Sequence, residues 1–157
     1  IFVGLAMNHI KLLIMDVDGT LTDGKIYMSA EGELLKAFNI KDGYAIAHLS
    51  EKDIIPVIIT GRSSKILLKR CGELGILELH QGIENKVSKL LSICDKYQVK
   101  PSNVAYIGDD LNDLECIKIC GYTAAPADAV KEVLYSVNYV CKHNGGEGAV
   151  REFIAKL

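Results

Sequence analysis

The sequence lacks the features of a membrane protein or a nucleic-acid-binding protein. No apolar run approaches the roughly 20 residues that a helix needs to cross a bilayer. Basic residues are scattered, and the formal charge of the 157-residue chain is −2, so no positive field would attract a nucleic acid. The apolar stretch 1–6 has no basic leader and is too short for a secretory signal. We therefore expect a protein that neither enters a membrane nor binds nucleic acid.

Disulfide and zinc patterns are also missing. The five cysteines form no CxxC motif, and their odd number favours a reduced compartment. Cys116 and Cys120 could share a helix face, but no histidine lies nearby in the sequence to complete a zinc site, so we interpret them as small buried hydrophobic residues. Linkers, repeats and low-complexity stretches are absent. We expect one domain over residues 1–157, with 1–8 as a leader that is disordered or was added before a natural start at Met7.

Apolar runs alternate with amphipathic stretches along the rest of the chain. We expect strands over 12–15, 54–60, 77–81, 104–107, 122–124 and 138–141, and helices over 44–52, 63–74, 85–97, 113–120, 129–134 and 149–157. This alternation predicts an α/β fold, a Rossmann-like parallel sheet with helices on both faces. Residues 25–38 depart from it, because two strand-like runs flank a polar turn at 29–33 and predict a β-hairpin inserted after the first strand. Residues 39–43 are expected to form a loop.

Two carboxylates follow the first expected strand. The run KLLIMDVDGTLT, residues 11–22, ends its apolar part at Met15 and continues with Asp16 and Asp18. Two acids one residue apart on an extended strand point to opposite faces, but a sharp turn at Gly19 would bring both to one small site. Paired buried acids are costly without a cation. The motif therefore indicates a divalent metal and one acid free to act as a nucleophile, and an acidic turn without chemistry is the alternative.

Other strand ends and helix starts carry polar groups of complementary type. They are Thr60, Gly61 and Arg62 after the second core strand, Lys86 at a helix start, and Asp109, Asp110 and Asp113 after the fourth strand. The carboxyl ends of parallel strands lie along one edge of a sheet, where ligands bind. Carboxylates suit Mg²⁺, whereas a hydroxyl, an ammonium and backbone N–H groups suit a phosphate. Together these groups predict phosphoryl transfer. Lys86 also opposes the dipole of its own helix, which favours a functional role over that of a solvated lysine.

These residues resemble a known family. DVDGT, a strand that ends in threonine, an isolated lysine and GDDLND match, in order, the four motifs of the haloacid dehalogenase-like phosphatases, from about residue 11 to residue 157. The resemblance implies that Asp16 is the nucleophile and forms an aspartyl-phosphate. Asp18 would be the general acid for the leaving group and then the base for water. Mg²⁺ would be held by Asp16, the backbone carbonyl of Asp18, and Asp109, while Asp110 and Asp113 would support the acidic motif.

The resemblance also implies how the substrate is held. Thr60 and the Gly61 N–H would bind the phosphoryl oxygens, and Lys86 would neutralise charge on the nucleophile and the phosphate. Arg62 and Lys41 are candidates to contact the carboxylate of an acidic sugar, with an ordinary surface role as the alternative for both.

Three longer segments resemble a small capless branch of this family: LTDGKIYMSAEGELLKAFNIKDG, ITGRSSK and NGGEGAVREF. The branch is typified by 3-deoxy-D-manno-octulosonate 8-phosphate phosphatase, so the resemblance implies a cytoplasmic enzyme of lipopolysaccharide biosynthesis that hydrolyses this phosphorylated sugar acid. A nine-carbon sialic-acid-type 9-phosphate is the alternative substrate. A catalytically silent oligomerisation domain, like the tail of acylneuraminate cytidylyltransferases, is the alternative without an activity. A receiver domain is disfavoured, because its acceptor aspartate would lie on the middle strand that here ends in Thr60.

The spacing of the motifs leaves no room for a lid domain. About forty residues separate Asp18 from Thr60, and 25 separate Thr60 from Lys86; the expected hairpin, helices and strand fill both gaps. Because phosphoryl transfer gains from a water-poor site, we hypothesise that neighbouring subunits cover it. The hairpin would otherwise expose an apolar edge, made of Ile26, Tyr27, Met28, Leu34, Leu35 and Phe38. The resemblance implies a homotetramer built around these hairpins, with active sites at the subunit interfaces.

Overall fold

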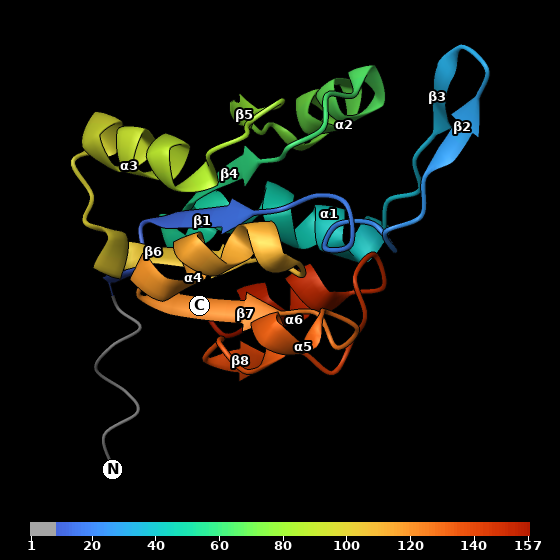
Figure 1. The fold of residues 1–157 in the computed structure, drawn as a ribbon. Coiled ribbons are helices and arrows are strands. Elements are labelled where there is room, and N and C mark those ends of the chain that lie inside the picture. Colours follow the sequence, from blue (N-terminus) through green and yellow to red (C-terminus); the bar gives the residue numbers. More distant parts are fainter. Residues whose placement is uncertain (1–8) are drawn as a thin grey trace.

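The apolar runs form the strands of one sheet in the computed structural model, which describes residues 9–157 (Figure 1). The strands are β1 (Leu12–Met15), β4 (Ile55–Ile59), β5 (Glu78–His80), β6 (Val104–Ile107), β7 (Tyr122–Ala125) and β8 (Tyr139–Val140). They lie in the order β5-β4-β1-β6-β7-β8, and every neighbouring pair is parallel. The first strand is therefore central, and its carboxyl end lies beside those of β4 and β6. The leader expected over residues 1–8 lies outside the described residues.

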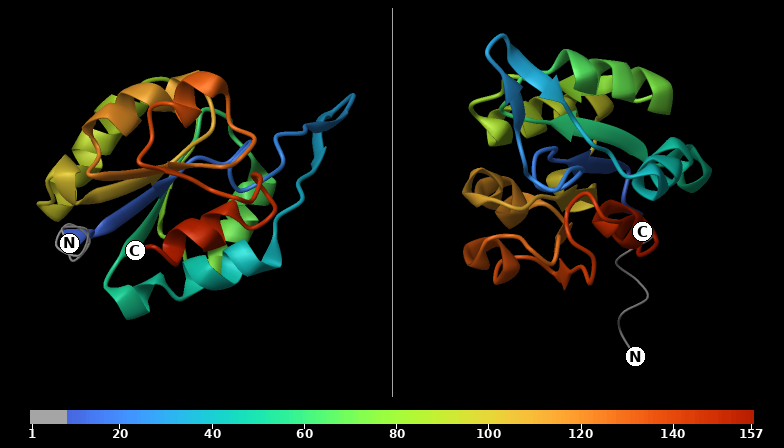
Figure 2. Two further views of the ribbon diagram at one scale, coloured as in Figure 1. Left: turned by 90° about the horizontal axis from the view of Figure 1, so that it is seen from below. Right: turned by 90° about the vertical axis from the view of Figure 1, so that its right-hand side faces the viewer.

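Helices cover both faces of this sheet (Figure 2). They are α1 (Ile40–Ala47), α2 (Lys65–Leu74), α3 (Lys86–Tyr97), α4 (Leu114–Ile119), α5 (Lys131–Leu134) and α6 (Ala149–Ile154). Side chains of β1 alternate between the two faces: Leu13 and Met15 pack in the core beneath α1, α2 and α6, and Leu12 and Ile14 pack beneath α3, α4 and α5. The predicted α/β fold with a doubly covered parallel sheet is confirmed.

The hairpin after the first strand is also present, and it projects from the body on the side of the sheet where β1 ends (Figure 1). Strands β2 (Tyr27–Ser29) and β3 (Gly32–Leu35) are antiparallel and are joined by only two residues, a tighter turn than expected. Five apolar side chains of the hairpin are exposed: Ile26, Tyr27, Met28, Leu34 and Leu35. Phe38 was wrongly assigned to this edge, because its ring packs against the core of the sheet instead.

The prediction of a loop over residues 39–43 is wrong. Helix α1 begins at Ile40, because the Asn39 side chain accepts hydrogen bonds from the N–H groups of Lys41 (2.8 Å) and Asp42 (3.2 Å) and so caps the helix. The helix then ends at Ala47, and the rest of the expected helix forms a 3₁₀ helix, Leu49–Lys52. Glycine and aspartate look like turn residues in the sequence, but here they lie in the first turns of a capped helix.

The segments between the strands contain no cap domain within the described residues. The hairpin, α1 and the 3₁₀ helix fill the segment between β1 and β4, and α2 and β5 fill the segment between β4 and α3. In residues 9–157 no helix combines the length and the apolar character that crossing a bilayer requires. The carboxyl edge of the sheet is thus left without a covering domain from the described chain.

Candidate active site

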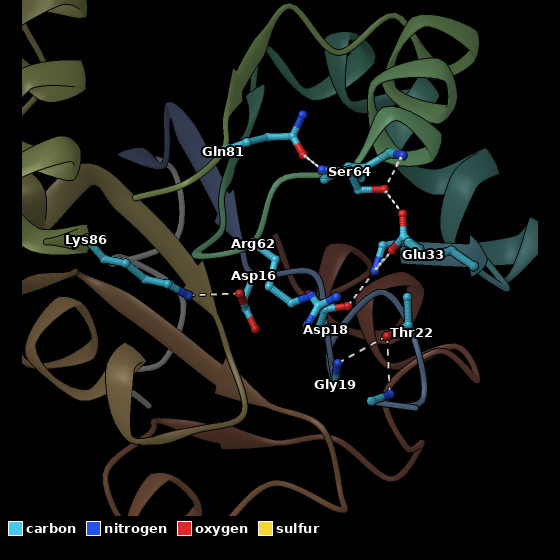
Figure 3. A network of polar contacts seen from close by, with 12 residues as sticks. Asp16, Asp18, Gly19, Thr22, Glu33, Arg62, Ser64, Gln81 and Lys86 are labelled. Atoms are coloured by element: carbon cyan, nitrogen blue, oxygen red, sulfur yellow. Dashed lines mark hydrogen bonds and ion pairs between the residues drawn. The ribbon is translucent and has the colours of Figure 1, made fainter. Parts of the chain in front are cut away.

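Asp16 and Lys86 meet at the carboxyl end of the central strand. Asp16 directly follows β1, and Lys86 is the first residue of α3. The Lys86 Nζ lies 2.8 Å from Asp16 Oδ1 and 2.8 Å from Asp113 Oδ1, and all three side chains are buried; Figure 3 shows the lysine pointing toward Asp16. Burial alone would lower the pKa of Lys86, but the charges of the two carboxylates raise it above its usual value. The ammonium is therefore a permanent positive charge beside Asp16.

Asp113 holds this lysine, and both of its carboxylate oxygens already accept hydrogen bonds. Its Oδ1 also accepts a hydrogen bond from the Tyr106 hydroxyl (2.6 Å). Its Oδ2 accepts from the N–H groups of Asp109 (3.0 Å) and Asp110 (3.2 Å). Burial raises the pKa of Tyr106 well above its usual value, so this hydroxyl stays a donor. Tyr106 was not predicted as a site residue, because a tyrosine inside the apolar run VAYI looks like an ordinary core residue.

Asp16, Asp109 and Asp113 form a cluster of buried acids. One side-chain oxygen of each lies within 4.8 Å of the others. Burial, a hydrogen bond with Asp16 and the Asp16 charge raise the pKa of Asp109 to about 8, and burial and Asp113 raise the pKa of Asp16. Lys86 pairs with Asp16 and Asp113 and not with Asp109, so ionising all three carboxyl groups would leave excess negative charge. Hard oxygen ligands in this arrangement fit a divalent cation such as Mg²⁺, and Asp16 and Asp109 are the two with oxygens available.

The turn after Asp18 lets Asp109 approach β1 closely. Gly19 has a φ of +95°, and a Cβ on it would lie 2.0 Å from Asp109 Oδ2, so only glycine fits. The Thr20 hydroxyl donates to Asp109 Oδ1 (3.1 Å) and fixes that side chain. The glycine-rich loop 144–148 packs on the same turn, because the Gly146 N–H donates to the Thr20 carbonyl (3.0 Å). Two distant glycine-containing segments therefore shape one wall of the site.

Asp18 has different surroundings from Asp16. Its Oδ1 accepts a hydrogen bond from Lys36 Nζ (2.7 Å), and its Oδ2 lies 3.9 Å from Arg62 Nε. Figure 3 shows Arg62 and Asp18 on the side of Asp16 away from Lys86. Lys36 follows β3, so the hairpin reaches back to the site through a contact that the sequence did not reveal. Asp16 is thus buried against Lys86, whereas the side chain of Asp18 is partly open to solvent.

The remaining predicted residues are placed as follows. Thr60 follows β4, and since Met15 pairs with Ile58 in parallel register it lies at the same sheet edge as Asp16. Its hydroxyl, on a nearly buried side chain, forms no hydrogen bond with a described residue, and the adjacent Gly61 is exposed. The Asp110 side chain accepts from the Leu111 N–H (2.7 Å) and caps the following 3₁₀ helix. Lys41 is exposed in the first turn of α1, and its ammonium makes no ion pair within residues 9–157.

Comparison with known proteins gives a consistent family assignment. A model of the haloacid dehalogenase-like hydrolases matches residues 72–154. Among curated proteins, 3-deoxy-D-manno-octulosonate 8-phosphate phosphatase of Escherichia coli (strain K12) is 47% identical over 145 residues, which cover 92% of this chain and 77% of that protein.

Solved structures give the same assignment. The 3-deoxy-D-manno-octulosonate 8-phosphate phosphatase of Yersinia pestis is 47% identical with a TM-score of 0.91, and the match covers 95% of this chain and 80% of that one. The Moraxella catarrhalis enzyme of the same name, solved with a magnesium ion, a phosphate ion and a KDO molecule, is 40% identical with a TM-score of 0.91, and the match covers 95% and 86%. Similarity therefore extends over nearly the whole chain in both sequence and fold.

Proposed function

The chain belongs to the haloacid dehalogenase-like hydrolase family, and we propose that it is a Mg²⁺-dependent phosphatase that hydrolyses 3-deoxy-D-manno-octulosonate 8-phosphate to the free sugar acid and phosphate. The substrate rests on the 47% identity with proteins of that name. The reaction rests on one observation, the buried contact of Lys86 with Asp16 at the end of β1. A carboxylate held in place by a permanent cation is arranged to attack a negatively charged phosphoryl group.

The two aspartates after β1 divide the chemistry between them. An Asp16 oxygen attacks phosphorus, and a new P–O bond forms while the bond to the sugar oxygen breaks. Asp18 donates a proton to that leaving oxygen. A water molecule then loses a proton to Asp18 and attacks phosphorus, which restores the Asp16 carboxylate and releases phosphate. Asp18 suits this double role, because its side chain is partly open to solvent whereas that of Asp16 is not.

The phosphoryl group needs donors as well as a nucleophile. The Thr60 hydroxyl and the Gly61 N–H lie at the edge of the sheet beside Asp16 and would donate to phosphoryl oxygens. Lys86 neutralises part of the charge that Asp16 and the phosphate bring together. Arg62 faces Asp18 across 3.9 Å, and with Lys41 it would contact the sugar carboxylate.

The acid cluster provides the ligands of Mg²⁺. Asp16, Asp109 and the backbone carbonyl of Asp18 would hold the ion, while Asp113 stays engaged with Lys86 and Tyr106. When bound, Mg²⁺ supplies positive charge that offsets the charge of the phosphoryl group. The raised pKa of Asp109, about 8, reflects the crowding of buried negative charge that such an ion relieves.

The alternatives have less support. Curated relatives that are 47% identical to this chain carry the octulosonate name and not that of a nine-carbon 9-phosphate. A silent oligomerisation domain would not need the complete set of acids and the buried lysine, and this chain has them all. We further propose one domain over residues 1–157 that acts in the cytoplasm, in lipopolysaccharide biosynthesis. The exposed apolar hairpin supports a homotetramer with active sites at subunit interfaces.

Steady-state turnover of octulosonate 8-phosphate, with and without Mg²⁺, tests the proposal. We expect activity that chelation abolishes and added Mg²⁺ restores. We also expect kcat/KM at least ~10-fold above that for nine-carbon 9-phosphates, about the discrimination available from one or two pocket contacts. Comparable rates on every sugar phosphate would reject the specific substrate, and unchanged activity after chelation would reject the metal dependence.

A further inference from the structure

The side chain of Lys36 is buried, although this residue directly follows the projecting hairpin. Only 5% of its side chain is exposed, whereas 74% of the side chain of Lys25, at the other end of the hairpin, is exposed. The Lys36 ammonium lies 2.7 Å from Asp18 Oδ1 and 3.0 Å from Glu33 Oε1. Burying an ammonium is costly unless its partners are well placed. Lys36 is therefore held by two specific carboxylates in a position where a surface lysine would ordinarily extend into water.

The contact continues from Glu33 into the phosphate-binding side of the site (Figure 3). Glu33 Oε2 accepts a hydrogen bond from the Ser64 hydroxyl (2.5 Å). Ser64 also caps α2, because its Oγ accepts from the Leu67 N–H (3.1 Å), and its own N–H donates to Gln81 Oε1 (2.7 Å). One chain of polar contacts thus joins Asp18, the hairpin and the loop after Thr60. Among the described residues, the only other side-chain contact between this loop and Asp18 is that of Arg62 Nε, which lies 3.9 Å from Asp18 Oδ2.

We propose that Lys36 is a positioning residue for Asp18, an inference that rests on the proposed function. Lys36 occupies Oδ1 of Asp18 and turns Oδ2 toward the substrate. Oδ2 is then the oxygen that gives its proton to the leaving sugar oxygen, as the bond from phosphorus to that oxygen breaks and the bond from Asp16 to phosphorus forms. The same oxygen later receives a proton from water. Lys36 touches neither substrate nor phosphate in this scheme.

Glu33 is the second carboxylate that holds Lys36, with Oε1 at 3.0 Å from the ammonium. Glu33 shares the ammonium, so the pair of Lys36 and Glu33 is close to neutral and orients Asp18 mainly through the direction of a hydrogen bond. Through Ser64, Glu33 also fixes the distance between this acid and the loop that would bind phosphate.

The dependence of the rate on the leaving group distinguishes positioning from a merely structural role. The sugar of octulosonate 8-phosphate is a poor alkoxide leaving group and needs a proton from Asp18, whereas 4-nitrophenyl phosphate releases a phenolate that does not. We would measure kcat/KM for both substrates with wild type, K36M, K36R and the matched control K25M. This constant reports steps up to the departure of the leaving group.

We expect K36M to lower kcat/KM for octulosonate 8-phosphate by about 10- to 100-fold, part of the ~10²- to 10⁴-fold that a general acid supplies. The constant for 4-nitrophenyl phosphate should fall less than ~3-fold. K36R should recover most of the loss, and K25M should match wild type on both substrates. An equal fall for both substrates in K36M would overturn the positioning role, as would no fall at all. A wild-type protein that hydrolyses neither substrate would instead overturn the proposed function.

Discussion

At the scale of single residues, the site is built on unequal charge. Asp16, Asp109 and Asp113 are clustered and largely buried, and within residues 9–157 Lys86 is the one cation paired with the cluster, through Asp16 and Asp113. Removing one partner of a buried ion pair leaves an uncompensated charge and is strongly destabilising. Binding a cation or a proton therefore lowers the electrostatic free energy of the cluster. This makes the stability of the protein a direct reporter of metal binding.

Replacing Asp109 with asparagine should separate stability from metal binding. We expect Mg²⁺ to raise the unfolding free energy of wild type by about 3 kcal/mol when the ion is present at about 100 times its dissociation constant. D109N replaces a carboxyl group whose ionisation is opposed by burial and by Asp16, so in chelator it should be at least as stable as wild type, but it should gain little from Mg²⁺. Urea unfolding with chelator and with Mg²⁺ measures both effects. The control E115Q changes an exposed carboxylate on α4 and should keep the full gain; a full gain in D109N would remove Asp109 from the metal site.

Replacing Asp16 with asparagine should abolish turnover while leaving the fold intact. An amide cannot act as the nucleophile, so we expect kcat to fall ~10³-fold or more, although the amide oxygen can still accept from Lys86. Steady-state kinetics and circular dichroism provide the two measurements. D23N, which lies after the turn at residues 18–21 and is exposed, is the control and should be fully active. Turnover close to wild type in D16N would exclude Asp16 as the nucleophile.

The sequence revealed some of these residues and hid others for physical reasons. Lys86 stood out because a lysine opposes the dipole at a helix start, and its burial between two acids accounts for that choice. Tyr106 was hidden because its ring lies among core residues, and only its hydroxyl, which donates to Asp113, takes part in the site. Lys36 and Glu33 were hidden because charged hairpin residues usually face solvent. Their contacts with Asp18 and Ser64 depend on where the hairpin lies relative to the sheet, and the local order of polar and apolar residues does not reveal that position.

At the scale of elements, the loop between β8 and α6 supports the turn after β1. A Cβ on Gly145 would lie 1.9 Å from the Gly19 carbonyl oxygen, which is backbone and cannot move aside easily. We expect G145A to displace the turn that carries Asp18, to lower kcat at least ~10-fold, since a misplacement of about 1 Å can cost ~10²-fold, and to destabilise the fold. Kinetics and thermal unfolding measure both.

Gly72 offers a matched control for this substitution. It lies inside α2, and a Cβ there meets nothing within 4 Å. G72A should stabilise the protein by up to about 1 kcal/mol, because alanine favours a helix more than glycine does, and it should leave kcat unchanged. A G145A variant as active as G72A would show that the loop does not support the site.

Glu152 on α6 holds the same loop through charge. Its carboxylate accepts hydrogen bonds from the Tyr139 hydroxyl (2.6 Å), the Lys142 N–H (2.8 Å) and His143 Nδ1 (2.5 Å). Burial alone would raise its pKa, but these bonds lower it from 4.5 to about 2. Because the folded state binds this proton more weakly than the unfolded state, the stabilisation is complete above pH 4.5 and disappears as pH falls through about 2.

The variant E152Q should therefore lose stability in a pH-dependent way. We expect it to be less stable than wild type by about 1.5 kcal/mol at pH 7, the low end of the contribution of a hydrogen bond to a charged group. The difference should shrink as pH falls from 4.5 toward 2. Urea unfolding at pH 7, 5 and 3 follows the trend. E147Q, in the exposed part of the loop, should match wild type throughout, and a difference for E152Q that does not change with pH would contradict the role of its charge.

Element types were easier to predict than element ends. The strands and the hairpin followed from apolar runs, since burial on a sheet demands them. The start of α1 did not follow, because Asn39 caps the helix through its side chain and makes Gly43 helical. The glycine is tolerated there for a tertiary reason: a Cβ on it would lie 2.3 Å from the Arg70 guanidinium. Whether such a glycine marks a turn or a close contact depends on a neighbour far along the chain.

At the scale of the whole molecule, the chain exposes its site and its hairpin together. No cap domain lies over the carboxyl edge of the sheet within residues 9–157, and the hairpin projects from the body on that side (Figure 1). Its apolar side chains, Met28 and Leu34 foremost, face solvent. Exposed apolar strands are avoided in monomers because they recruit partners. If hairpins from several copies pack together, their apolar side chains become buried, and neighbouring chains cover each site.

Breaking the hairpin contact should therefore reduce activity without touching the site. We expect wild type to be a tetramer by light scattering and the double variant M28K/L34K to dissociate, because two buried charges per chain oppose association. Dissociation should lower kcat/KM, since it opens the site to water and removes any contact from a neighbour. E31K, at the hairpin turn, changes charge without removing apolar surface and should remain a fully active tetramer. A monomeric M28K/L34K with wild-type kcat/KM would mean that one chain completes its own site, and the exposed hairpin would then need another explanation.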